Sequence, residues 1–147
     1  DGTDPRIGFV EQLIKDCGTT GDVIVYNAGF ERGKLNDLIE VFPQYENQLL
    51  AIIDRIVDLM IPFREKWYYL PEMRGSYSIK QVLPALVPEL SYKDLEISEG
   101  GTAFNTFAEM VMGTFKGDIV QTRQNLLEYC KLDTYAMVKI LEKLYNA

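Results

Sequence analysis

The stretch VIVYNAGFERGKL (23–35) decides the fold of this chain. Its first part, VIVY (23–26), is apolar and rich in β-branched residues, which predicts a short strand buried on both faces. The run stops at NAGF, and the apolar spacing that follows predicts a helix from about Glu31 that Pro43 closes. A strand, a loop and a helix in this order indicate a layered α/β domain.

Most of the remaining sequence has a helical pattern. The segment IVDLMIPF (56–63) fits either the end of a helix or a short strand, so VIVY is the one clear strand. A stable sheet needs further strands, which we expect upstream of this chain. The sequence therefore predicts a single α/β domain over residues 1–147 that is predominantly helical by residue count. The other expected helices cover residues 5–17, 44–57, 79–86, 101–112 and the stretch from the KGD turn (116–118) to the end of the chain.

The composition of the chain excludes several classes of enzyme. Histidine is absent, which rules out Ser-His-Asp hydrolases, Cys-His proteases and zinc enzymes with histidine ligands. The only cysteines, Cys17 and Cys130, lie at apolar helical positions, where we expect them to be buried and unpaired. Any chemistry must therefore rely on carboxylates, tyrosine, lysine, arginine or serine, and a cytoplasmic protein fits best.

The charge and the apolar runs limit the partners of the chain. Its 15 Lys and Arg residues against 22 Asp and Glu residues give a net charge of −7, which offers no footprint for nonspecific nucleic-acid binding. An enzyme that meets nucleic acid only at its reacting end, through metal ions, is compatible with this charge. No apolar run approaches the length of a membrane span, so we expect no membrane partner.

Two acidic positions are candidates for a functional site. Glu31 follows Asn27 beyond the carboxyl end of VIVY, where α/β folds build their sites. The alternative is that Asn27 closes a turn and Glu31 complements the helix dipole. Near the C-terminus, Asp133 lies on an apolar helix face one turn after Tyr129, so their side chains can reach a common point. Asp133 would otherwise accept from a backbone N–H or pair with an arginine or lysine.

The segment GSYSIK (75–80) supplies weaker candidates. Tyr77 and Lys80 can contact a phosphate or sugar at the start of a helix. The alternative is structural, with Ser78 capping the helix and Tyr77 packing in the core. Asp58 follows an apolar run and is either a site residue or a turn or cap residue.

Two segments together resemble the DEDD 3′–5′ exonucleases of the RNase H-like superfamily. VYNAGFE (25–31) is similar to their second motif, an apolar strand followed by Asn-x-x-Phe-Asp at the start of a helix, with Glu31 in place of the usual Asp. YCKLDTYAMVKILEKL (129–144) is similar to the third motif in its tyrosine form, Tyr-x-x-x-Asp. The resemblance implies a partial RNase H-like α/β fold.

A closer similarity is to a bacterial family catalogued as a domain of unknown function. In that family a strand bearing Asp-Phe-Glu lies further upstream than this chain begins, so we expect the chain to be the C-terminal portion of the domain. The shared phrases are YNAGFE (26–31), VDL (57–59), GSYSIKQVLPAL (75–86), ELSYKDLEI (89–97) and EYCKLDTYAM (128–137).

The exonuclease resemblance implies hydrolysis at the ends of single-stranded DNA or RNA, with two Mg²⁺ or Mn²⁺ ions held by carboxylates. By this resemblance Glu31 and Asp133 bind metal, Tyr129 orients the attacking water and Asn27 supports the site. The strand with the first motif, Asp-x-Glu, is missing from this sequence. We therefore expect half of a metal site that is inert by itself, and apolar surface through which the chain can form a homo-oligomer.

The alternative hypothesis is a degenerate nuclease fold that serves as a binding or scaffolding module in a larger nucleic-acid-processing protein. The net charge of −7 favours it. So does Glu31, because its extra methylene moves the carboxylate by about one C–C bond in a site built to sub-ångström tolerance.

Overall fold

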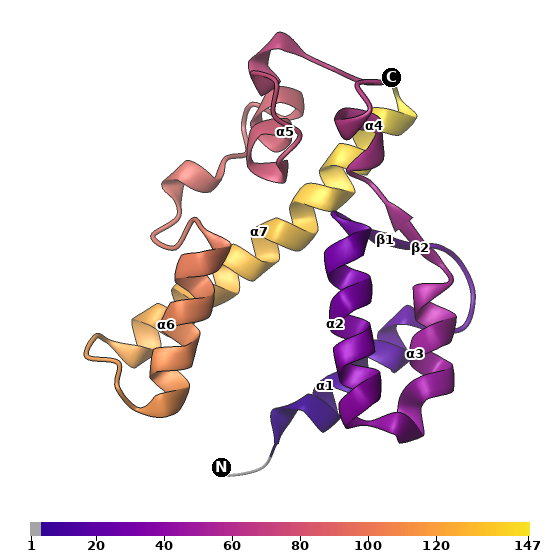
Figure 1. Cartoon of the computed structure of the whole chain (residues 1–147). Coiled ribbons are helices and arrows are strands. Elements are labelled where there is room, and N and C mark those ends of the chain that lie inside the picture. The colour runs from indigo at the N-terminus through magenta and orange to yellow at the C-terminus, as the bar shows by residue number, and fades with distance from the viewer. Residues whose placement is uncertain (1–3) are drawn as a thin grey trace. The chain divides into compact units, whose positions relative to one another are not determined.

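The computed structural model describes residues 4–147, and these divide into two compact units with the boundary between Pro62 and Phe63 (Figure 1). Each unit is described by itself. Residues within each unit contact one another more than they contact the other unit. The expectation of a single RNase H-like domain stays a prediction. Helices predominate throughout, and strands are few, as the sequence predicted.

The first unit pairs two parallel strands that are joined by helices. Strands β1 and β2 align Val23 with Ile56 and Val25 with Asp58. Parallel pairing requires a crossover connection, which α2, η1 and α3 provide. The segment 56–63, ambiguous in sequence, thus contains a strand followed by a short helix. The elements are α1 (Pro5–Cys17), β1 (Val23–Val25), α2 (Ala28–Val41), η1 (Pro43–Tyr45), α3 (Glu46–Ile53), β2 (Ile56–Asp58) and α4 (Ile61–Arg64), which straddles the boundary.

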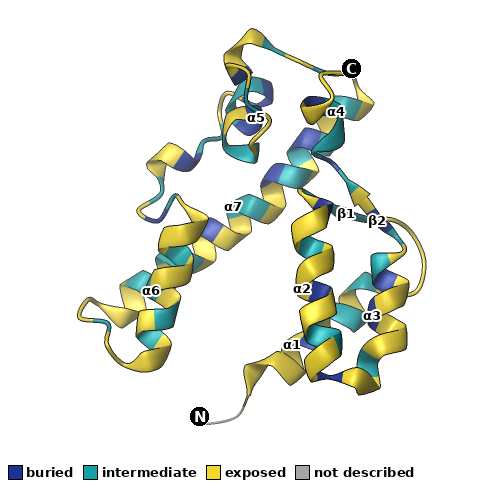
Figure 2. Ribbon diagram, in the orientation of Figure 1, coloured by how far each residue is buried: buried dark blue, intermediate teal, exposed yellow. Residues whose placement is uncertain are grey.

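The core of the first unit lies between its helices, and the strands lie at its margin (Figure 2). Val10 of α1 and Leu49 of α3 are fully buried, with Leu35 of α2 beside them. The three residues of β1 are only half-buried. The expectation of a strand buried on both faces is therefore wrong, because each described strand has a single neighbour and helices cover it incompletely.

Arg55 holds the end of α1 against the start of β2. Its guanidinium donates to backbone carbonyls on both sides of the α1–β1 turn, and its Nε donates to the Ala51 carbonyl at 3.2 Å. These bonds explain why the helical pattern at 44–57 breaks at Ile53, because Arg55 must face the turn rather than continue α3. The carbonyl acceptors in the turn are Cys17 at 3.2 Å, Gly18 at 2.8 Å, Thr20 at 2.9 Å and Gly21 at 2.8 Å.

Replacing Arg55 with lysine tests this arrangement. Arg55→Lys keeps the charge but loses the planar fork, so we expect the free energy of unfolding to fall by about 1–3 kcal/mol in urea titrations. The matched control is Arg123→Lys at an exposed position of α7 (Ile119–Tyr145), which should change stability by less than about 0.5 kcal/mol. Equal stability of Arg55→Lys and wild type would show that these hydrogen bonds contribute little.

The second unit is helical and is organised around α7. Val82 and Leu83 of α5 pack toward Ala136 and Ile140 of α7, and all four are fully buried. The helix α7 begins directly after the KGD turn, where the Asp118 carboxylate accepts from the Gln121 N–H at 3.0 Å. The other elements are η2 (Pro71–Met73), α5 (Ile79–Leu86), η3 (Tyr92–Asp94) and α6 (Gly100–Met112).

Several local expectations require correction. The helix after VIVY begins at Ala28, three residues before Glu31. Cys130 is exposed rather than buried, and Cys17 is half-buried; both thiols are free. The α7 face that turns inward is centred on Tyr129, Ala136 and Ile140, one position away from the face that would bury Cys130. No helix within residues 4–147 has the length and apolar character that a membrane span requires.

Candidate functional site

Asp58 organises the carboxyl ends of both strands. Its Oδ1 accepts from the Asn27 and Met60 N–H groups, and its Oδ2 accepts from the Ala28 N–H, each at 3.0 Å. The carboxylate thus satisfies the first N–H groups of α2 from the neighbouring strand, which is why the helix starts at Ala28. The sequence left Asp58 as either a site residue or a turn or cap residue, and in the structure its carboxylate caps the start of α2.

Asn27 occupies the turn between β1 and α2 in a left-handed conformation, with φ of 75°. Asparagine tolerates this conformation better than most residues. Its side chain makes no capping bond, and its backbone N–H binds Asp58. Asn27 therefore closes a turn, as the structural alternative held, and its role as a supporting site residue stays a prediction.

Glu31 lies in the first turn of α2 and is half-buried. It lines a cavity of about 140 Å³ whose other walls are mostly apolar side chains of α1 and α2, among them Leu13 and Leu35. Burial raises the pKa of Glu31, because the apolar surroundings disfavour the charged form. The cation in the lining of the same cavity is Lys34, which is paired with Asp37 at 2.9 Å.

Removing one acceptor from Asp58 tests its capping role. Asp58→Asn places an amide group against backbone donors, so we expect a loss of about 1–3 kcal/mol of unfolding free energy and faster hydrogen exchange at the Ala28 amide. Asp54→Asn, at an exposed position four residues earlier, is the matched control and should leave that exchange rate unchanged. Slow exchange at Ala28 in both variants would contradict the capping role.

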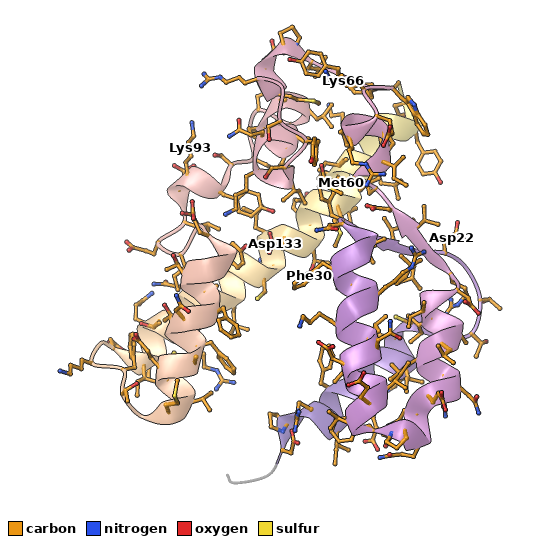
Figure 3. All side chains as sticks on the ribbon, viewed as in Figure 1. Asp22, Phe30, Met60, Lys66, Lys93 and Asp133 are labelled. Atoms are coloured by element: carbon orange, nitrogen blue, oxygen red, sulfur yellow. The ribbon has the colours of Figure 1, made fainter. Side chains whose placement is uncertain are left out.

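Asp133 lies in the middle of α7 (Figure 3). Its Oδ1 accepts a hydrogen bond from the Tyr92 hydroxyl at 2.7 Å. Tyr129, one turn earlier, lies close enough to Asp133 for the carboxylate to raise its pKa. The rings of Tyr92 and Tyr129 lie 6.1 Å apart between centroids, and both tyrosines are buried. The structure thus brings Tyr129 and Asp133 together, as the helical spacing predicted, and adds Tyr92, which the sequence analysis missed.

The environment of Tyr129 keeps its hydroxyl protonated. Burial, together with the negative charge and hydrogen bond of Asp133, raises the pKa of Tyr129 to about 12. The first turn of α6 closes over this hydroxyl, since a Cβ at Gly100 would lie 3.4 Å from it. Tyr129 therefore acts as a neutral hydrogen-bond donor at physiological pH.

The raised pKa predicts a pH-dependent stability difference. An unfolded tyrosine ionises near pH 10, whereas folded Tyr129 does so near pH 12, so its stabilising contribution is complete below pH 10 and is lost as the pH rises towards 12. We expect the stability gap between wild type and Tyr129→Phe to narrow by about 1–2 kcal/mol over this range. Urea unfolding at several pH values measures the gap. The control is Tyr145→Phe, at a highly exposed position of the same helix, for which the gap should stay constant.

The remaining candidates lie around Tyr92 and the start of α5. The Lys80 Nζ is 5.9 Å from the centroid of the Tyr92 ring, within cation–π range. Tyr77 is 45% exposed, so the expectation that it packs in the core is wrong. Ser78 occupies the N-cap of α5 without a side-chain capping bond; instead, its N–H donates to the Ser76 Oγ at 3.2 Å. Contact of Tyr77 or Lys80 with substrate stays a prediction.

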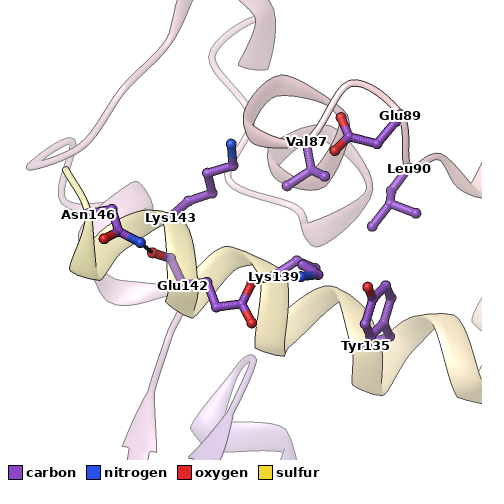
Figure 4. A pocket seen from close by; sticks show the side chains of 8 residues that line it. All are labelled: Val87, Glu89, Leu90, Tyr135, Lys139, Glu142, Lys143 and Asn146. Atoms are coloured by element: carbon purple, nitrogen blue, oxygen red, sulfur yellow. Dashed lines mark hydrogen bonds and ion pairs between the residues drawn. The ribbon is translucent and has the colours of Figure 1, made fainter.

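A groove of about 490 Å³ lies between the segment after α5 and the C-terminal third of α7 (Figure 4). Lys139 binds Glu142 at 2.7 Å and lies 5.4 Å from the Tyr135 ring centroid. Two lysines and two glutamates line the groove, so it carries no net charge and offers little attraction to a phosphate backbone. The lining residues are Val87, Glu89, Leu90, Tyr135, Lys139, Glu142, Lys143 and Asn146.

Glu31 and Asp133 can be tested as ligands of the expected Mg²⁺ or Mn²⁺ ions by the kind of atoms that they offer. Glu31 and Asp133 offer carboxylate oxygens, the donors that Mg²⁺ and Mn²⁺ take. They belong to different units, and their convergence on one pair of ions stays a prediction. Over the described range 4–147, no group of three His, Cys, Asp or Glu side chains is placed to hold a metal ion. The chain thus fits the expected ions in the kind of donor, and the metal-binding roles of Glu31 and Asp133 stay predictions.

Comparison with known proteins identifies the family of the chain. A protein-family model matches residues 1–78, which are more than half of the 147 residues. The chain belongs to the family of domains of unknown function DUF2779. This confirms the sequence-based resemblance to such a family. The DUF2779 match includes Asn27, Glu31 and Asp58, whereas Tyr129 and Asp133 lie beyond it.

A relative shares most of the chain. The uncharacterized protein UU173 of Ureaplasma parvum serovar 3 is 28% identical over an alignment of 141 residues, and the match covers 80% of this chain and 19% of the relative. The chain therefore spans about a fifth of the length of that curated relative. No solved structure matches the chain significantly.

Proposed function

We propose that this chain is the C-terminal portion of a metal-dependent 3′–5′ exonuclease domain, which acts on the ends of single-stranded DNA or RNA in the bacterial cytoplasm. Glu31 and Asp133 would hold Mg²⁺ or Mn²⁺, and Tyr129 would orient the attacking water. When bound, the ions would supply an activated water and charge stabilisation of the leaving oxygen. An upstream strand bearing Asp-x-Glu would complete the ligand set.

The observation that carries this proposal is the pairing of Tyr129 with Asp133 on one turn of α7. Tyr129 is neutral and lies beside Asp133, and Asp133 accepts one hydrogen bond, from Tyr92, out of the about four that a carboxylate can accept. This pairing suits a residue that positions water beside a metal-bound carboxylate. The parallel pair β1–β2, with Glu31 just beyond its carboxyl end, supports the same reading.

A second candidate function is the degenerate fold used as a binding or scaffolding module. The specific observation in its favour is Glu31, which faces an apolar cavity and whose pKa burial raises. A carboxylate that had lost its metal partner would have this character. In this reading the protein would bind single strands without shortening them.

The decisive assay uses the full-length protein with Mn²⁺ and 5′-labelled single-stranded DNA and RNA. We expect progressive shortening from the 3′ end, and we expect Asp133→Asn to slow it at least about a hundredfold, because the ligand to the ions is weakened. Gel analysis of the labelled products measures the rate.

Glu128→Gln, which makes the same change of charge at an exposed position of α7, is the control and should retain full activity. Activity that survives Asp133→Asn unchanged would end the enzyme hypothesis for this site. Binding of single strands without any shortening would support the module instead.

Self-association of the chain stays a prediction. Exposed apolar side chains on α6 offer surface for it, and sedimentation of the purified chain measures it. These side chains are Phe104, Phe107, Val111 and Met112, which are between 57% and 73% exposed.

A further inference from the structure

We propose that Tyr92 is a positioning residue for Asp133, holding its carboxylate in the orientation needed to bind a divalent cation. This inference rests on the proposed function, because it assigns Asp133 to a metal. It concerns a residue that lies outside both motifs of the exonuclease resemblance. Tyr92 comes from η3, 41 residues before Asp133 in the chain.

The contact has the geometry of a strong, fixed hydrogen bond. The distance of 2.7 Å from the Tyr92 hydroxyl to Asp133 Oδ1 is typical of an O–H donor bound to a carboxylate. Tyr92 is 4% exposed, so water competes little for its hydroxyl. A donor that is fixed in this way restricts rotation of the carboxylate it binds.

The position of Tyr92 is itself well determined by its neighbours. The Tyr92 ring packs against the Tyr129 ring, with 6.1 Å between the two centroids. The Lys80 ammonium lies 5.9 Å from the centroid of the Tyr92 ring. The preceding residue, Ser91, fixes the start of η3 by accepting from the Lys93 N–H at 3.1 Å. Tyr92 thus links η3 and, through Lys80, α5 to the Asp133 side chain on α7.

The hydrogen bond from Tyr92 leaves other acceptor positions on the carboxylate. Tyr92 occupies one acceptor position of Asp133, out of about four on a carboxylate. Groups that hydrogen bond to metal-binding carboxylates orient them, and their loss typically weakens metal affinity by about 10- to 100-fold. Tyr92 fits this outer role because it touches the carboxylate and brings no charge of its own.

The test compares wild type, Tyr92→Phe and Asp133→Asn in the full-length protein. Tyr92→Phe removes the hydroxyl and keeps the ring, so its packing against Tyr129 is retained. We expect the dissociation constant for Mn²⁺, measured from the electron paramagnetic resonance signal of free Mn²⁺, to rise about tenfold. The Mn²⁺ concentration for half-maximal nuclease activity should rise by the same factor, with the KM for the strand unchanged. Tyr145→Phe on α7 is the matched control and should leave both quantities unaltered.

The outcomes separate the two proposals. If Asp133→Asn abolishes activity while Tyr92→Phe binds Mn²⁺ as tightly as wild type, the role of Tyr92 is overturned and the proposed function stands. If Asp133→Asn changes neither Mn²⁺ affinity nor activity, both are overturned. The assays are run at a temperature at which circular dichroism shows all variants folded, so a loss of stability alone, without a change in Mn²⁺ affinity, also counts against the positioning role.

Discussion

The structure of the first unit depends on one carboxylate that satisfies three backbone N–H groups. Asp58 is the last residue of β2. Its carboxylate accepts from the N–H groups of Asn27 and Ala28 at the start of α2, and from the N–H of Met60, two residues after Asp58. Two strand ends and a helix start therefore share a single anchor. Glu31 sits one turn further along α2, so Asp58 fixes the start of the helix that carries it. Any chemistry at Glu31 inherits that constraint.

The second unit contains a comparable centre built on different chemistry. Asp133 is half-buried beside two phenol groups, and within residues 4–147 its hydrogen bond comes from the Tyr92 hydroxyl. A hydroxyl donor satisfies a carboxylate without neutralising it, whereas a lysine or arginine partner would cancel its charge. A charge that is held but not cancelled remains available to a cation. This is the physical basis of the proposal that Asp133 binds a cation.

The sequence predicted what depends on local pattern and missed what depends on distant partners. The helix α1, the strand β1 and the meeting of Tyr129 with Asp133 all follow from spacing within a few residues. The start of α2 was misplaced because its cap, Asp58, lies 30 residues away. Tyr92 was missed for the same reason. Local pattern cannot report a hydrogen bond across 41 residues, nor decide which of two adjacent helix faces turns inward, as at Cys130.

Arg55 binds the turn before β1 through the backbone carbonyls of that turn. Arg55 donates to four carbonyl oxygens between Cys17 and Gly21, so these hydrogen bonds do not depend on the side chains of the turn. Gly18 and Gly21 have φ of 55° and 81°, a conformation that suits glycine. We therefore expect that Thr19 and Thr20 can be substituted during evolution without disturbing the fold. An inserted or deleted residue would shift the carbonyls out of reach of the guanidinium, so this segment should vary in identity far more readily than in length.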